Sequence, residues 1–165
     1  MSSSTTDPWR AAVLTVSDSC ARGQRNDLSG PALVEALKKR NFRVVATGIV
    51  SDDQSAIEKA IIRFCAEAGL VVTTGGTGVA QRDVTPEATW AVCERLLEGV
   101  AERMRFEGAK NTPFAMLSRG VCGVRGESVV LNVPGNPKGA VESLEAVIDL
   151  LPHALQLLSG HTDHD

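Results

Sequence analysis

The chain has 165 residues, 43% of them hydrophobic and 22% charged, which is typical of a soluble globular domain and excludes wholesale disorder. Its 17 basic and 20 acidic residues give a net charge of −3, so no basic surplus indicates a nucleic-acid partner or an anionic membrane surface. No apolar run approaches the roughly 20 residues of a membrane span. We expect one domain over residues 9–160, a disordered N-terminal tail over residues 1–8 and a C-terminal tail over residues 161–165.

The four cysteines are far apart and form no CxxC pair. The chain also begins without the basic region and apolar core of a signal peptide, so we expect reduced thiols and a cytoplasmic location. No zinc site is expected. Two of the three histidines, His161 and His164, lie in the polar C-terminal tail, which could scavenge a metal ion but more often is a frayed end.

The first half of the chain alternates predicted strands and helices. Apolar, β-branched runs predict strands over residues 11–16, 43–50 and 70–74. Apolar residues at helical spacing predict one helix that opens near Pro31 and another that follows Asp52 and Asp53, which can cap it. Gly69 is placed to end the second helix.

The second half continues the alternation. Thr85 is predicted as an N-cap with Pro86 in the first helical position, and the helical pattern runs on to Leu97. A further helix is predicted over residues 100–109, two strands over residues 121–125 and 128–133, and helices from there to Leu158 with a break at Pro152. The pattern predicts a three-layer α/β/α fold, with helices on both faces of a mostly parallel twisted sheet.

Four unusual polar or glycine-rich segments follow four of the predicted strands. They are residues 17–19, 51–53, 73–78 and 134–138. The carboxyl ends of parallel strands share one edge of the sheet, where ligands of such folds bind. We therefore expect these segments to meet at one rim.

The segment Thr73-Thr-Gly-Gly-Thr-Gly78 offers backbone amides and hydroxyls without bulk, as a phosphate-binding loop requires. It is not a P-loop, because no Gly-Lys-Ser/Thr follows, and not a dinucleotide fingerprint, because Gln81 stands where a third glycine is needed. The alternative is a plain tight turn. The helix start that follows it favours an anion site.

Asp52 and Asp83 each follow a predicted strand by a few residues. Together they could hold Mg²⁺ against a polyphosphate, since Mg²⁺ takes oxygen ligands. The alternatives are a helix N-cap for Asp52 and an ion pair with Arg82 or Arg103 for Asp83.

The segment from Pro134 to Lys138 is rigid and precedes a predicted helix, and Lys138 could meet an anion as a point charge. The alternative is an ordinary strand-to-helix turn. No Ser/His/Asp or Cys/His set is indicated, because His153 lies inside a late helix and is more typical of packing or surface.

Several motifs in the same order resemble the molybdopterin adenylyltransferase family, which includes bacterial MogA-type enzymes and gephyrin G domains. They span residues 13–20, 27–30, 73–78, 82–89, 116–126 and 132–138, and TTGGTG followed by RDVTPEAT is specific as a joint signature. The resemblance implies a three-layer α/β fold, a homotrimer, and Mg²⁺-ATP and molybdopterin as substrates. A separate molybdenum-insertion protein is a possible partner.

The resemblance also implies residue roles. Asp52 and Asp83 are expected to bind the metal and ATP. The nucleotide and its phosphates are assigned to Ser17, Thr74, Gly75, Gly76, Thr77 and Gly78. The pterin side is assigned to Ser118, Pro134, Gly135, Asn136 and Lys138. The alternative functions are a non-catalytic molybdopterin-binding or trimerisation module, or a MoaB-type paralogue.

Overall fold

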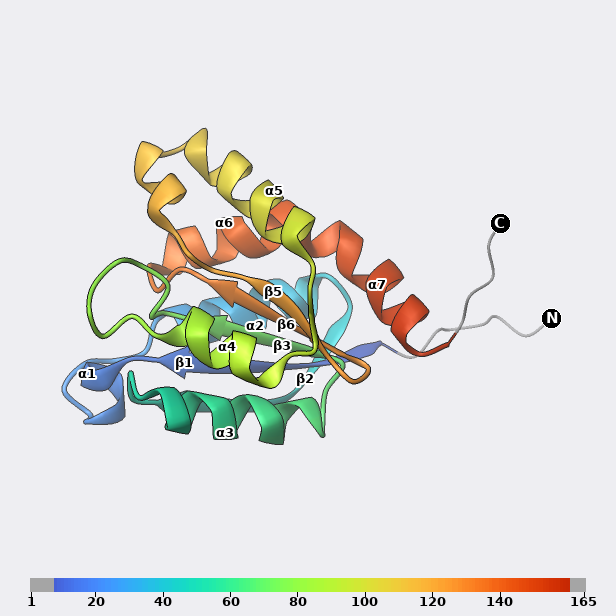
Figure 1. The fold of residues 1–165 in the computed structure, drawn as a ribbon, viewed down its shortest axis with the longest axis horizontal. Coiled ribbons are helices and arrows are strands. Elements are labelled where there is room, and N and C mark those ends of the chain that lie inside the picture. Colours follow the sequence, from blue (N-terminus) through green and yellow to red (C-terminus); the bar gives the residue numbers. More distant parts are fainter. Residues whose placement is uncertain (1–7, 161–165) are drawn as a thin grey trace.

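The computed structural model describes residues 8–160, so residues 1–7 and 161–165 of the predicted tails, with His161 and His164, lie outside the described residues. The described chain forms a six-stranded sheet in the order β2-β1-β3-β6-β5-β4 (Figure 1). The strands are β1 (Trp9–Val16), β2 (Phe42–Val50), β3 (Leu70–Thr74), β4 (Arg95–Leu96), β5 (Cys122–Arg125) and β6 (Ser128–Val133). Strands β2, β1, β3 and β6 are parallel, whereas β5 and β4 are antiparallel to their neighbours.

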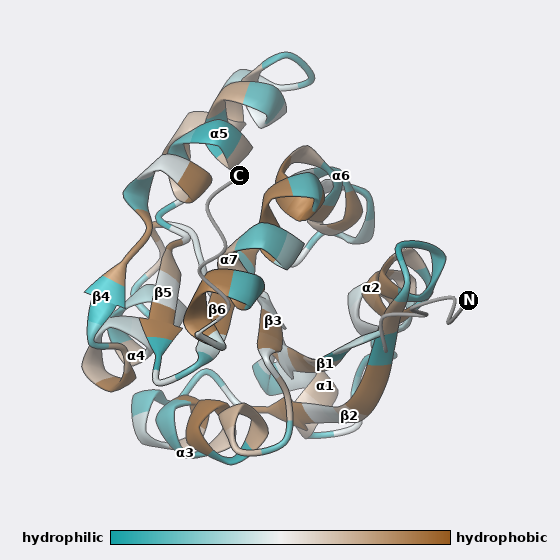
Figure 2. Ribbon diagram, turned by 90° about the vertical axis from the view of Figure 1, so that its right-hand side faces the viewer, coloured by the Kyte–Doolittle hydropathy of each residue, from teal (hydrophilic) through white to brown (hydrophobic). Residues whose placement is uncertain are grey.

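Helices cover both faces of this sheet (Figure 2), which confirms the predicted fold class. The helices are α1 (Asp18–Ala21), α2 (Ser29–Lys39), α3 (Gln54–Cys65), α4 (Thr85–Val92), α5 (Glu98–Ala109), α6 (Pro137–Val147) and α7 (Leu151–Leu158), with short 3-10 turns η1 (Pro113–Leu117) and η2 (Ile148–Leu150). Helices α2, α5, α6 and α7 pack on one face, and α3 and α4 on the other. No helix in the described part of the chain combines the length and the apolar character needed to cross a membrane.

Strand β1 shows why the sheet is buried on both sides. Its side chains alternate between the two cores: Ala11 and Val13 pack under α2, while Ala12 and Leu14 pack against α3. All four side chains are at most 1% exposed. A strand with both faces covered gives the continuous apolar run that the sequence shows.

The predicted helix that continued to Leu97 is wrong beyond Val92. Helix α4 ends there, and the two residues of β4 pair with β5 instead. The amide of Glu94 donates to the Val124 carbonyl (2.9 Å), and the amide of Leu97 donates to the Cys122 carbonyl (2.8 Å). Both residues of β4 are exposed, so no apolar alternation marked them as a strand.

The predicted cap of α3 is confirmed at Asp53, which accepts from the Ala56 amide, so the alternative role of Asp52 as the N-cap is wrong. Two other predicted helix boundaries need correction. Val84 precedes α4, and the Thr85 hydroxyl does not cap the helix. Helix α3 ends at Cys65, so Gly69 instead leads into β3, where its amide donates to the Arg10 carbonyl (3.1 Å).

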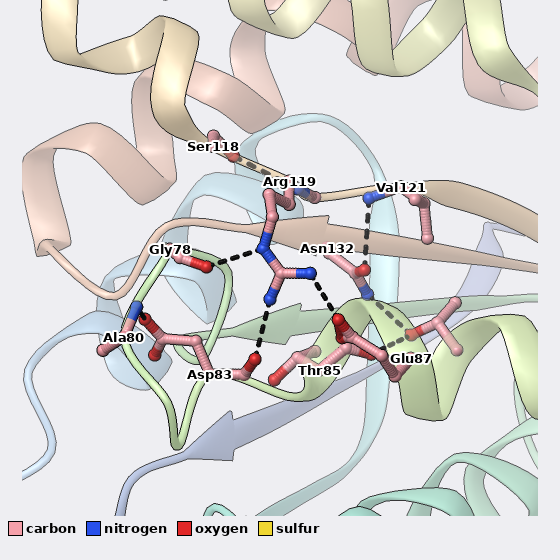
Figure 3. A network of polar contacts seen from close by, with 11 residues as sticks. Gly78, Ala80, Asp83, Thr85, Glu87, Ser118, Arg119, Val121 and Asn132 are labelled. Atoms are coloured by element: carbon pink, nitrogen blue, oxygen red, sulfur yellow. Dashed lines mark hydrogen bonds and ion pairs between the residues drawn. The ribbon is translucent and has the colours of Figure 1, made fainter.

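Asn132 joins the parallel and antiparallel parts of the sheet. Its side-chain nitrogen donates to the hydroxyls of Thr73 (2.9 Å) and Thr89 (3.0 Å). Its side-chain oxygen accepts from the backbone amide of Val121 (3.2 Å) (Figure 3). The residue is 1% exposed. Every polar group of this side chain therefore has a partner in a site that water does not reach.

We expect Asn132→Asp to lower the free energy of unfolding by about 3 kcal/mol, because the carboxylate cannot donate to the two hydroxyls and is buried as a charge. The urea midpoint of the variant measures the loss. Asn136→Asp is the matched control: Asn136 caps α6 at an exposed position, and a carboxylate there can still accept. An unchanged midpoint for Asn132→Asp would remove Asn132 from this account of the sheet.

Candidate functional site

The four polar segments lie at one rim of the sheet, since each follows one of the neighbouring parallel strands β1, β2, β3 and β6. A cavity of about 330 Å³ opens there. Its lining includes the predicted residues Ser17, Thr74, Gly135 and Asn136, together with Cys20 and Asp27. The predicted meeting of the segments is thus confirmed.

Local hydrogen bonds hold the predicted cavity residues. Ser17 caps α1 by accepting from the Cys20 amide (3.2 Å), and Asn136 caps α6. The Thr74 hydroxyl donates to the Pro134 carbonyl (2.7 Å), which ties the ends of β3 and β6 together. A β-carbon on Gly135 would lie 3.3 Å from Gly75 Cα, so the two loops pass closely.

Asp27 is a cavity residue that the sequence analysis did not single out. Its two carboxylate oxygens accept from the Thr15 hydroxyl (2.7 Å) and the Gly30 amide (3.0 Å). A β-carbon on Gly30 would overlap the Asp27 carboxylate. The Asp-Leu-Ser-Gly spacing therefore fits a carboxylate held beside the start of α2.

Asp52 is paired with Asp18 through two reciprocal hydrogen bonds. The Asp18 amide donates to Asp52 Oδ2 (2.9 Å), and the Asp52 amide donates to Asp18 Oδ1 (3.0 Å). Arg82 grips Asp18 with two further bonds, from Nε to Oδ2 (2.6 Å) and from Nη2 to Oδ1 (2.9 Å). Asp18 thus connects the segments that follow β1, β2 and β3.

The two aspartates have opposite electrostatic environments. The Arg82 guanidinium, with the Asp52 amide, lowers the pKa of Asp18 to about 2. Partial burial raises the pKa of Asp52, and the Asp18 and Asp83 carboxylates raise it further. The Asp52 and Asp83 carboxylates therefore repel each other electrostatically.

Asp83 forms no ion pair with Arg82 or Arg103, the two arginines that the sequence offered as its partners. Arg82 pairs with Asp18, and Arg103 pairs with Asp149. Asp83 Oδ2 instead accepts from the Ala80 amide (2.9 Å) within its own loop.

Asp52 and Asp83 share a pattern that suits a hard cation. In each residue, one carboxylate oxygen accepts a hydrogen bond from a backbone amide. The other carboxylate oxygen accepts from no donor among the described residues. Within residues 8–160, no three His, Cys, Asp or Glu side chains gather into a metal site. Mg²⁺ commonly takes one or two carboxylates and completes its shell with phosphate oxygens and water, so this pair fits it.

The carbonyls of residues 75–78, in the glycine-rich loop after β3, all accept hydrogen bonds from the protein, and Figure 3 shows that of Gly78. Thr85 donates to two of them, from Oγ1 to Gly75 (2.9 Å) and from its amide to Gly76 (3.1 Å). Arg119 donates to the next two, from its amide to Thr77 (2.8 Å) and from Nε to Gly78 (2.8 Å).

The amides of the same loop are left for a ligand. In a trans peptide the N–H points away from the preceding C=O, and the described chain contains no cis bond. The amides of residues 76–79 therefore point away from Thr85 and Arg119, and they donate to no acceptor among residues 8–160. Successive amides without an acceptor in the protein suit an oxyanion.

Two residues of this loop have positive φ angles, a backbone conformation that favours glycine. Gly75 has φ 100° and Gly76 has φ 68°. A β-carbon on Gly76 would overlap the Thr85 hydroxyl and lie 3.2 Å from Asp52 Oδ1. Gly78 has ordinary φ, but a β-carbon there would lie 2.9 Å from Asp83 Oδ2. Two of the glycines thus bring the loop against the two aspartates.

The predicted division between nucleotide and pterin sides does not follow the cavities. Gly135 and Asn136 share the cavity of about 330 Å³ with Ser17, whereas Pro134 and Ser118 line a separate one of about 40 Å³. The Lys138 side chain is 85% exposed and faces Glu142 (3.9 Å), and it lines neither cavity.

The described cysteines are free thiols, as predicted. Burial raises the pKa of Cys65 to about 11 and that of Cys93 and Cys122 to about 12. These three thiols are therefore poor nucleophiles at neutral pH.

Comparison with known proteins identifies the family of this chain. A family model described as "Probable molybdopterin binding domain" matches residues 12–153. The molybdopterin adenylyltransferase of Helicobacter pylori is 44% identical over 153 residues, which cover 90% of this chain and 87% of that protein. The chain belongs to the molybdopterin adenylyltransferase family.

Two further comparisons support this family assignment. The molybdopterin adenylyltransferase of Escherichia coli is 37% identical over 167 aligned residues, covering 92% of this chain and 86% of that protein. The crystal structure of the molybdopterin biosynthesis enzyme MoaB from Thermus thermophilus superposes with a TM-score of 0.87 at 48% identity, covering 92% of this chain and 97% of that one.

The Asp18–Arg82 pair predicts a pH effect. In Arg82→Gln we expect the Asp18 pKa to rise from about 2 toward 3.8, because the paired cation is lost. Carbon-13 NMR titration of the metal-free protein measures this shift. The stabilisation by the depressed pKa is full above about pH 3.8 and is lost as pH falls through about 2, so the stability difference between wild type and variant should shrink across this window and vanish below it. An Asp18 titration that does not move would contradict the pairing.

Proposed function

We propose that this chain is a molybdopterin adenylyltransferase, which transfers the adenylyl group of ATP to the terminal phosphate of molybdopterin and releases pyrophosphate. The observation that carries the proposal is the row of free amides over residues 76–79 beside the half-free carboxylates of Asp52 and Asp83. This arrangement suits a polyphosphate and a divalent cation. The names of the curated relatives support it.

The proposed roles follow from these positions. The loop amides bind phosphate oxygens through charge-assisted hydrogen bonds. Asp52 and Asp83 would hold Mg²⁺, which when bound supplies positive charge at the transferring phosphates. Ser17, Thr74, Gly135 and Asn136 surround an organic part of one substrate in the cavity of about 330 Å³. The chain thereby positions two anionic reactants, which is the main demand of phosphoryl-type transfer.

The proposed reaction needs no general base on the protein. The attacking group is a phosphate that is already ionised at neutral pH. His153 lies exposed on α7, which packs near the start of β1 and not at the rim (Figure 1). Orientation and electrostatic stabilisation by fixed groups therefore carry the proposed catalysis.

A MoaB-type paralogue is the second candidate, and the 48% identity to the molybdopterin biosynthesis enzyme MoaB is the observation in its favour. A non-catalytic binding module differs from both in turnover. An adenylyltransferase releases pyrophosphate from Mg²⁺-ATP only when molybdopterin is present, whereas a binding module releases none.

The proposed assembly is a homotrimer in the cytoplasm, with a molybdenum-insertion protein as a possible partner. Large apolar side chains on α5 and η1 are exposed, including Phe106 (69%) and Phe114 (74%), and such surface suits an interface. We expect light scattering to report about three times 17.4 kDa at micromolar concentration. A monomer at that concentration would refute the trimer.

We expect Asp52→Asn to lower kcat at least about a hundredfold, as when one electrostatic stabiliser is lost. Molybdopterin binding should stay near normal, since asparagine can still accept from the Asp18 amide. Pyrophosphate release and a molybdopterin binding titration measure the two effects.

Asp53→Asn is the matched control for this experiment. It removes a neighbouring negative charge but keeps the acceptor that caps α3, so its turnover should stay near wild type. Near wild-type turnover by a folded Asp52→Asn protein would leave Asp83 as the only protein ligand that we assign to the metal.

A further inference from the structure

We infer that Arg119 is a positioning residue that orients the amide row of residues 76–79 toward a phosphate group and so sets the affinity of the loop for phosphates. The inference rests on the proposed function, because it concerns the same loop. The Arg119 guanidinium lies on the side of the loop to which the Gly78 carbonyl points (Figure 3), and the N–H of a trans peptide points the other way.

Arg119 binds the loop at both of its ends. Its amide donates to the Thr77 carbonyl (2.8 Å) and its Nε to the Gly78 carbonyl (2.8 Å), so two successive peptide planes are held in one orientation. Its Nη2 donates to the Asp83 carbonyl (2.7 Å) at the far end of the loop. Arg119 therefore orients two of the amides, one through its own backbone amide and one through its side chain, and its side chain also anchors the backbone of Asp83.

The protein supplies an acceptor to every nitrogen of the guanidinium. Nη1, the remaining nitrogen, pairs with Glu87 Oε1 at the start of α4, so each guanidinium nitrogen has a protein acceptor. Arg119 is thus arranged to act through the loop and not as a direct phosphate ligand. A lysine could not replace it, because one ammonium cannot present donors to three separated acceptors in a planar fork.

The backbone around Arg119 is itself held in place. Two residues further on, the backbone amide of Val121 donates to the side-chain oxygen of Asn132 (3.2 Å). The backbone amide of Asn132 donates to the Val121 carbonyl (2.9 Å). Asn132 is buried in β6. The position of Arg119, and through it that of the loop, therefore derives from the sheet.

The experiment compares wild-type protein with Arg119→Lys, Arg119→Gln and the control Arg125→Lys. Arg125 is also a partly buried arginine, and it donates to one carbonyl, that of Val92, without touching the loop. Affinities for Mg²⁺-ATP and for pyrophosphate with Mg²⁺ are measured by calorimetry. Hydrogen exchange of residues 75–84 is followed by mass spectrometry, and thermal melting reports folding.

In the wild-type protein, we expect both phosphate ligands to slow exchange of the amides of residues 76–79. In Arg119→Lys, the loop should exchange faster without ligand, and both affinities should fall at least about tenfold, the effect of about one charge-assisted hydrogen bond. Arg119→Gln should behave likewise, and Arg125→Lys should match wild type. The wild-type exchange experiment stays decisive if neither Arg119 variant folds.

A folded Arg119→Lys protein with wild-type affinity and loop exchange would overturn the inference. So would ligand binding to wild type that leaves the exchange of residues 76–79 unchanged. Weaker Mg²⁺-ATP binding by Arg119→Lys, together with a wild-type protein that binds Mg²⁺-ATP with loop protection but never releases pyrophosphate in the presence of molybdopterin, would refute the proposed function while supporting the role of Arg119.

Discussion

Where β3 ends, the chain must leave the sheet between two neighbouring strands and still satisfy its backbone carbonyls. The exit is narrow: the Gly75 amide donates to the Val133 carbonyl of β6 (3.2 Å), and a β-carbon on Gly75 would overlap the Val16 carbonyl of β1. Unpaired carbonyls are costly where water is excluded. Thr85 and Arg119 supply the donors, and because peptide units are planar this choice turns the opposite amides outward. The binding properties of the rim follow from that requirement.

The strands and their order along the chain were predictable because their cause is local. A run such as Leu70–Thr74 is buried on both faces, so its apolar character is continuous and easily recognised. Once alternating helices imply parallel strands, the carboxyl ends must share an edge. The positions of Asp52, of the glycine loop and of the segment after β6 therefore followed from topology. Among the strands, only the antiparallel β4 was not predicted, because its two exposed residues show no apolar periodicity.

The partners of the site residues were not predictable, because they lie far away in the sequence. Asp18 and Asp52 are 34 positions apart, and Arg82 and Asp18 are 64 apart. Thr85 shows the same limit at shorter range: its sequence context is that of an N-cap, yet its hydroxyl donates to the Gly75 carbonyl instead. A local rule describes what a side chain can do, and the fold decides which acceptor it reaches.

The charges at the rim explain why this site would require a cation. The Asp18 charge is compensated by Arg82, whereas Asp52 and Asp83 have no ion-pair partner among residues 8–160. At an effective dielectric constant of about 20, two like unit charges about 4 Å apart repel by about 4 kcal/mol. A polyphosphate on the loop amides would meet this repulsion from two carboxylates, and a chain with a net charge of −3 offers no long-range attraction to offset it. A divalent ion held by the two carboxylates would supply positive charge to the phosphates, so the acidic residues are a reason for the Mg²⁺ dependence that we propose.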